Sequence, residues 1–130
     1  MTRYDPDRAP DPAAWLALEE SERIGRIAAF HAAAGITPPN AQMHAAMHSV
    51  VENQIAEEMT TVDDTLARLC AEGLSRHEAV HAIGWVLVSH LTALMGRRGK
   101  GREAVEDYVR ELRSLTAEGW REHARQKRTI

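Results

Sequence analysis

Two histidine pairs with the same four-residue spacing constrain this chain more than any other feature. His77 and His81 form a literal H-E-x-x-H, and a long apolar run follows them. His44 and His48 repeat the spacing on a second segment with helical apolar periodicity. Residues four apart lie about 40° apart around an α-helix, so both rings of a pair can reach one ion. The two pairs therefore predict two neighbouring helices that share a metal site.

The remaining apolar pattern also predicts helices. Residues such as Asp11 before Pro12, and Gly35 and Gly73 after apolar stretches, are typical helix start and stop signals. The predicted helices span about 12–34, 41–58, 62–72, 75–95 and 102–125. No stretch of any length alternates like a strand, and short connections favour antiparallel neighbours. We expect an all-α, single-domain, up-and-down bundle of about five helices.

The length of the chain and the composition of its ends predict its domain organisation. At 130 residues it is most simply one domain, which is large enough to bury a core without disulfides. Residues 1–10 are polar and rich in proline and are expected to be a flexible N-terminal arm. Residues 11–125 form the expected helical metal-binding domain, and residues 126–130 are expected to be a frayed tail.

Composition disfavours several classes of partner. The net charge of −3 gives no overall attraction to nucleic acid or anionic membranes, so the basic loop at 96–101 is interpreted as solvated. No apolar run reaches the length of about 18 residues that a membrane span needs, and the N-terminus lacks the apolar centre of a signal peptide. The single cysteine, Cys70, suits a reducing compartment. We expect a cytoplasmic protein with no nucleic-acid or membrane partner; a homodimer is compatible with the sequence.

The predicted metal site uses the two histidine pairs and one carboxylate. His44, His48, His77 and His81 are the candidate ligands, and Glu52 follows one turn after His48. Glu52 is expected either to bind the ion or to orient an imidazole through its second ring nitrogen. Such a donor set suits one transition metal ion, with zinc or iron favoured and nickel or copper also compatible. The alternative is four histidines satisfied by ordinary hydrogen bonds.

Glu78 has two interpretations. In an H-E-x-x-H metalloenzyme it is the general base beside the metal, which makes it the candidate catalytic residue. Ser75-x-x-Glu78 is also a capping box, which by itself explains the glutamate. A zincin peptidase is disfavoured, since Leu87 stands where a metzincin has its third histidine. A ferritin-like di-iron site is disfavoured because it needs a second Glu-x-x-His.

The other notable residues are interpreted without a metal. His31 is expected to be a satisfied histidine at a helix end, and His90 and His123 are placed outside the site, His123 as a solvated residue. Gly84 is better explained by a close helix crossing than by room for a substrate. Trp85 is better explained by core packing than as a pocket wall.

The pattern Asn40-x3-His44-x3-His48-x3-Glu52-x-Gln54, followed by His77-x3-His81, resembles the bacterial family named domain of unknown function 1841. The resemblance covers roughly residues 40–108. It implies that the four histidines and Glu52 belong to the defining residues of that family. Ala41 stands where the family usually has proline. The family has no assigned activity, so the resemblance supports a site and leaves the reaction open.

Three functional hypotheses follow from these patterns. The favoured one is a metal-dependent enzyme, a hydrolase or a non-haem oxidoreductase, that activates water or binds dioxygen and acts on a small molecule. The second is a non-catalytic metalloprotein in which histidines close the coordination shell. The third is a metal-free helical module for dimerisation or interaction.

Overall fold

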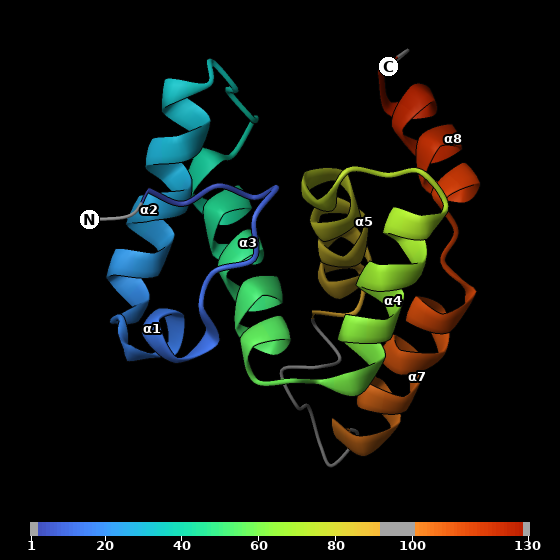
Figure 1. The fold of residues 1–130 in the computed structure, drawn as a ribbon. Helices are drawn as coiled ribbons and strands as arrows, with labels where there is room; N and C mark the ends of the chain where they lie inside the picture. The colour runs from blue at the N-terminus through green and yellow to red at the C-terminus, as the bar shows by residue number, and fades with distance from the viewer. Residues whose placement is uncertain (1–2, 92–100, 129–130) are drawn as a thin grey trace.

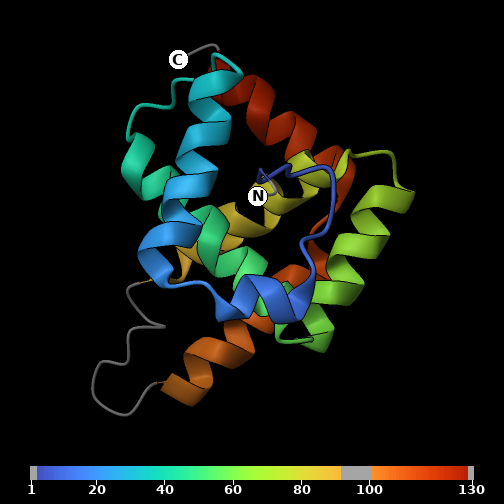
Figure 2. The same cartoon turned by 60° about the vertical axis from the view of Figure 1, so that its left-hand side comes forward.

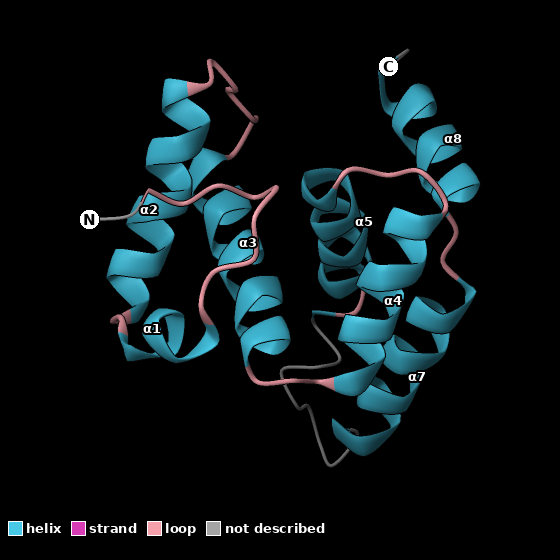
Figure 3. Cartoon of the chain, in the orientation of Figure 1, coloured by secondary structure: helices cyan, strands magenta, loops and turns pink. Residues whose placement is uncertain are grey.

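The computed structural model describes residues 3–91 and 101–128. These residues fold into helices with no strand among them, which confirms the all-α class (Figure 3). The described residues contain seven helices: α1 (Pro12–Ala17), α2 (Glu20–Ala33), α3 (Ala41–Ala56), α4 (Thr60–Ala71), α5 (Arg76–Ser89), α7 (Gly101–Ser114) and α8 (Ala117–Arg128). The basic residues at 97, 98 and 100 and the predicted helix end at Met95 lie outside the described residues. No helix in the described part is long and apolar enough to span a membrane.

The expectation of one helix over residues 12–34 was wrong, because the chain breaks at Leu18. Leu18 and Glu19 are both extended, and α2 begins only at Glu20. A helix break leaves carbonyl groups without intrahelical partners. Here Arg23 supplies the donors: its guanidinium donates to the carbonyl oxygens of Leu16 at 3.1 Å and Leu18 at 2.7 Å. A side chain from the following helix thus stabilises the break.

The last predicted helix is also divided, which raises the number of described helices above five. The helix α7 ends at Ser114 and α8 begins at Ala117. Arg68 of α4 and Glu72, the residue that caps the C-terminus of α4, hold this junction. Arg68 donates to the carbonyl oxygen of Leu112 at 3.0 Å, and Glu72 accepts from the amide of Ala117 at 2.8 Å. The break therefore depends on packing against α4, which is distant in sequence.

The helix α3 lies between α2 on one side and α5 on the other (Figure 1). The larger apolar core joins α3, α4, α5 and α7, with Val51, Leu69, Ile83 and Leu112 fully buried. A smaller apolar cluster lies on the other side of α3 and contains Tyr4, Trp15, Ile27 and Ala45. Three of the buried polar residues, His31, His48 and Glu52, come from α2 and α3.

Gly84 lies where α3 and α5 approach each other closely. A methyl group added at Gly84 would overlap the side chain of Met47 on α3. The close crossing predicted from the sequence is therefore confirmed for this glycine. The approach also brings the histidines of α5 within reach of those on α3.

Residues 3–11 form no helix, yet part of this segment is held against the helices. Tyr4 is 5% exposed and Pro6 is fully buried. Arg76 on α5 donates to the carbonyl oxygen of Pro6 at 2.9 Å, and the amide of His77 donates to Asp7 at 3.1 Å. The segment passes in front of α3 in Figure 1, and in Figure 2 it runs to the beginning of α5 and turns back to enter α1. The region expected to be a flexible arm thus contributes a buried side chain beside the histidines.

Candidate metal centre

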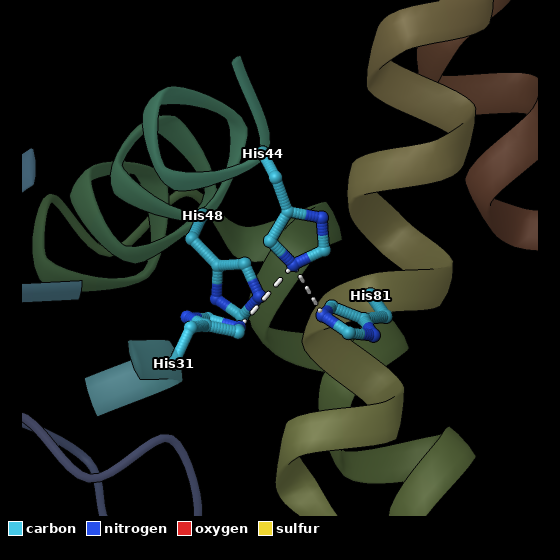
Figure 4. A group of neighbouring side chains, drawn as sticks. All are labelled: His31, His44, His48 and His81. Atoms are coloured by element: carbon cyan, nitrogen blue, oxygen red, sulfur yellow. Dashed lines mark hydrogen bonds between the residues drawn. The ribbon is translucent and has the colours of Figure 1, made fainter. Parts of the chain in front are cut away.

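Four histidines from three helices gather at the interface of α2, α3 and α5. His31 comes from α2, His44 and His48 come from α3, and His81 comes from α5 (Figure 4). One potential ligand nitrogen from each residue lies within 4.8 Å of those from the other three. We call these four residues the histidine cluster. Such a group could hold a metal ion.

Local helix signals place the two cluster residues of α3. Asn40 caps the helix by accepting from the amide of Met43 at 3.1 Å, which fixes where the helix begins. His44 and His48 then lie one turn apart and on the same side as the buried Val51. The helical spacing that predicted this pair is confirmed, and the pair points toward α5 and α2 as Figure 4 shows.

His31 presents one particular ring nitrogen to the cluster. Its Nδ1 lies 2.9 Å from the carbonyl oxygen of Ile27, one turn earlier on α2. A carbonyl oxygen only accepts hydrogen bonds, so Nδ1 carries the proton and donates it. In the neutral ring the lone pair is then on Nε2, which faces the Nε2 of His44 at 3.2 Å. His31 is therefore oriented as a metal ligand would be.

His48 is oriented in the same way by a side chain. The hydroxyl of Tyr4 donates to Oε2 of Glu52 at 2.6 Å, so its oxygen is left to accept from Nδ1 of His48 at 3.4 Å. That tautomer leaves the lone pair of His48 on Nε2. Among the described residues, this buried Nε2 has no hydrogen-bond partner. A buried nitrogen with an unused lone pair is costly in a core, whereas it is what a metal ligand requires.

The distances between Nε2 atoms fit a shared ion. Nε2 of His44 lies 3.0 Å from Nε2 of His81 and 3.2 Å from Nε2 of His31. Ligand nitrogens at about 2.0–2.1 Å from zinc are separated by roughly 3.3 Å in a tetrahedron. The observed separations are close to this value. The residues present thus fit a bound transition metal ion.

Three rings of the cluster, those of His44, His48 and His81, have lowered pKa values. Burial lowers the pKa of His44 to about 4 and that of His81 to about 3, with neighbouring histidines adding to the shift. Burial also lowers the pKa of His48 far below its usual range. Imidazole binds a metal only in its unprotonated form. At neutral pH these three rings are therefore ready to coordinate.

His77 lies next to the histidine cluster but is not one of its four members. Its ring centroid is 4.6 Å from that of His81 and 5.4 Å from that of His48. Its Nε2 is also buried and has no hydrogen-bond partner within the described part of the chain. The structure thus brings all four predicted histidine ligands together and adds His31 to them.

Glu52 is beside the cluster, behind His48. Its side chain is fully buried, and Arg76 binds both carboxylate oxygens at 2.8 Å. Oε2 also accepts the hydrogen bond from Tyr4. Because both oxygens are already engaged, the geometry favours the orienting role expected for Glu52 over direct ligation. The hydroxyl of Tyr4, which is held by Glu52, in turn orients the ring of His48.

Glu78 lies on the exposed first turn of α5. The Oγ of Ser75 accepts from the amide of Glu78 at 3.1 Å, and a carboxylate oxygen of Glu78 is 3.5 Å from that Oγ. The first contact is the serine half of the predicted capping box. The second joins the glutamate to the Ser75 hydroxyl and not to the Ser75 backbone amide. The role of Glu78 as a general base stays a prediction.

The two remaining histidines lie elsewhere. His90 pairs with Glu111 at 2.7 Å. His123 was expected to be solvated, but it is partly buried and its ring centroid lies 4.3 Å from that of Trp85. The tryptophan provides an apolar surface for the histidine, which explains the difference.

Sequence reasoning missed three residues of the centre. His31 was assigned to a helix end, although it follows the buried Ile27 by one turn, and that spacing was the available signal. Tyr4 and Arg76 had no local signal, because their partners Glu52 and His48 are 24 to 48 residues away along the chain.

Comparisons of this chain with protein-family models, with curated proteins and with solved structures found no match. The resemblance to domain of unknown function 1841 stays a prediction from the sequence.

Proposed function

We propose that this chain is a metalloprotein that holds one transition metal ion through His31, His44, His48 and His81. The observation that carries the proposal is the orientation of the rings. The Nδ1 atoms of His31 and His48 are engaged outside the cluster. Nε2 of His44 lies 3.2 Å from Nε2 of His31 and 3.0 Å from Nε2 of His81. His77 is the candidate fifth ligand.

The donor set indicates the kind of ion. Neutral imidazoles suit zinc, iron, nickel and copper, and they disfavour magnesium and calcium, which prefer oxygen ligands. Zinc or iron remains the favoured ion. The buried carboxylate of Glu52 is paired with Arg76, so it contributes no net charge to the centre.

We further propose that the protein is an enzyme that acts on a small molecule, either a hydrolase or a non-haem oxidoreductase. His44 and His81 are only partly buried, which gives the centre a side that solvent reaches. A metal bound there would supply Lewis acidity toward water or a binding position for dioxygen. His77 lies beside the cluster with a free Nε2, where it can bind the ion or hold a proton.

A non-catalytic metal clasp is the second candidate function. The four ligands come from three helices, so one ion would tie α2, α3 and α5 together. In that case four nitrogens close a tetrahedral shell and the metal contributes to folding.

The first experiment is elemental analysis of protein purified without an affinity tag or a chelator. About one equivalent of a transition metal is expected, as one ion fills one four-nitrogen site. The variant His48→Ala/His81→Ala should lose that metal, while His90→Ala/His123→Ala, which removes two histidines outside the cluster, should keep it. A wild-type protein that contains no metal and takes none up on titration would contradict the proposal.

Cobalt substitution separates the enzyme from the clasp. Azide added to cobalt-loaded protein should change the visible spectrum if a coordination position is open, as catalysis requires. An unchanged spectrum, together with unfolding after metal removal, would favour the clasp.

A further inference from the structure

A ligand-sized cavity lies beside the histidine cluster and is separate from it. A cavity of about 700 Å³ is formed between Tyr4 and the outer side of α2, including Ala29, Phe30 and Ala33. Pockets for small organic ligands are typically about 300–1,000 Å³ and mostly apolar, with a few polar groups. The cavity has the size and the apolar walls of such a pocket.

The inner wall of the cavity is shared with the metal centre. The ring of Phe30 packs edge-on against His31, with centroids 5.4 Å apart, and against His77 at 5.6 Å. Tyr4, the other aromatic wall residue, contacts His48 through its hydroxyl oxygen. Any molecule seated in the cavity would therefore touch two side chains that directly contact three of the five histidines.

The charged groups of the cavity point to an anion. Arg3 and Arg26 both line it, and none of the described lining residues is acidic. Glu22 pairs with Arg26 at 2.7 Å from outside the lining. Two guanidinium groups line the cavity and one carboxylate pairs with one of them, so the charges of these residues favour a negatively charged ligand. Guanidinium groups bind carboxylates well because their donors fit the two oxygens.

We propose that this cavity binds a small carboxylate with an apolar body. The carboxylate lies between Arg3 and Arg26, and the apolar body lies against Phe30, Ala29 and Ala33. This inference does not depend on a bound metal, because every residue that carries it lies outside the set of proposed ligands.

The test is binding of octanoate to the protein as purified, measured by isothermal titration calorimetry and by NMR shifts. Octanamide, which has the same length without the charge, should bind at least about tenfold more weakly, as expected when a charge-assisted hydrogen bond is lost. Arg26→Gln should weaken octanoate binding to a similar extent, and Arg26→Lys should restore part of it. Glu22→Gln should strengthen it, since this change removes a competing carboxylate.

Two further variants locate the site. Ala33→Trp fills the cavity from an exposed helix position and should abolish binding. Arg8→Gln is the matched control, because Arg8 lines the neighbouring cavity and not this one. Equal affinity for octanoate and octanamide, or octanoate binding that survives Ala33→Trp, would overturn the proposal. Neither result would affect the metal content on which the proposed function rests.

Discussion

The hydroxyl oxygen of Tyr4 lies 3.4 Å from Nδ1 of His48, although the two residues are 44 positions apart in the chain. The same hydroxyl donates to Glu52, which is held by Arg76. Burial, together with the negative charge of Glu52, raises the pKa of Tyr4 far above its usual range, so the hydroxyl keeps its proton. A buried ion pair thus sets the tautomer of one imidazole in the cluster.

Replacing Tyr4 tests this orienting contact. Tyr4→Phe removes the acceptor for Nδ1 of His48 and should lower metal affinity by about 10- to 100-fold, the usual cost of losing an outer-shell partner. Competition with a coloured chelator measures this change. Tyr108→Phe is the matched control, because its hydroxyl donates to Gln54 outside the cluster. Equal losses in the two variants would mean that Tyr4 has only a general packing role.

His31 provides a second test, because it was added to the site by the structure. His31→Ala should reduce the metal bound at equilibrium and shift the spectrum of the cobalt-loaded protein, since one nitrogen leaves the shell. His90→Ala, which removes the contact with Glu111 on the partly exposed surface, should leave both unchanged. A wild-type spectrum in the His31→Ala variant would remove His31 from the ligand set.

The buried ion pair predicts a large effect on stability. Glu52→Gln keeps the shape of the side chain but leaves Arg76 without its countercharge, which should destabilise the fold by roughly 3–5 kcal/mol. Urea unfolding of the metal-free protein measures the free energy. Glu22→Gln breaks the exposed pair with Arg26 and should cost less than about 1 kcal/mol. Similar decreases in the free energy of unfolding in the two variants would show that the burial of Glu52 adds little to the contribution of its ion pair to stability.

The neutral histidines make the metal-free protein sensitive to acid. His44 and His81 have pKa values of about 4 and 3 in the folded chain, and about 6.5 is usual in an unfolded one. Between these values the unfolded state binds more protons, so the stability of the fold falls as pH falls. Urea unfolding of chelator-treated protein from pH 7 to pH 4 should show this decline, and His44→Gln should make it shallower. A stability independent of pH in that window would contradict the neutral, buried assignment.

The helical periodicity of the sequence was sufficient to predict the class of fold and much of the candidate site. The spacing of His44 and His48, and of His77 and His81, is a local property, because one helix turn brings each pair to one face. The helix cap formed by Ser75 and the close approach of helices at Gly84 could also be predicted, because each depends on one residue type at one position. These predictions needed no knowledge of how the helices are arranged.

Features that depend on tertiary packing could not be read from the sequence. The sequence pattern predicts a continuous helix across Leu18. The break there is stabilised by a side-chain contact, the hydrogen bonds from the guanidinium of Arg23 to the carbonyl oxygens of Leu16 and Leu18. Residues 3–11 are polar and rich in proline, and Tyr4 is buried because it packs in one apolar cluster with residues of α1, α2 and α3. His31 joins the cluster because α2 packs on α3. Its spacing from Ile27 indicates only that it faces inward, and does not identify the histidines that it meets there.

The most direct test of the central claim is X-ray absorption at the edge of the bound metal. A shell of about four nitrogens at roughly 2.0–2.1 Å for zinc, with the multiple scattering of imidazole rings, is the result that the histidine cluster predicts. The His48→Ala variant should lose part of that scattering. A shell made of sulfur, or of oxygen without imidazole scattering, would contradict the assignment of the histidine cluster as the metal site.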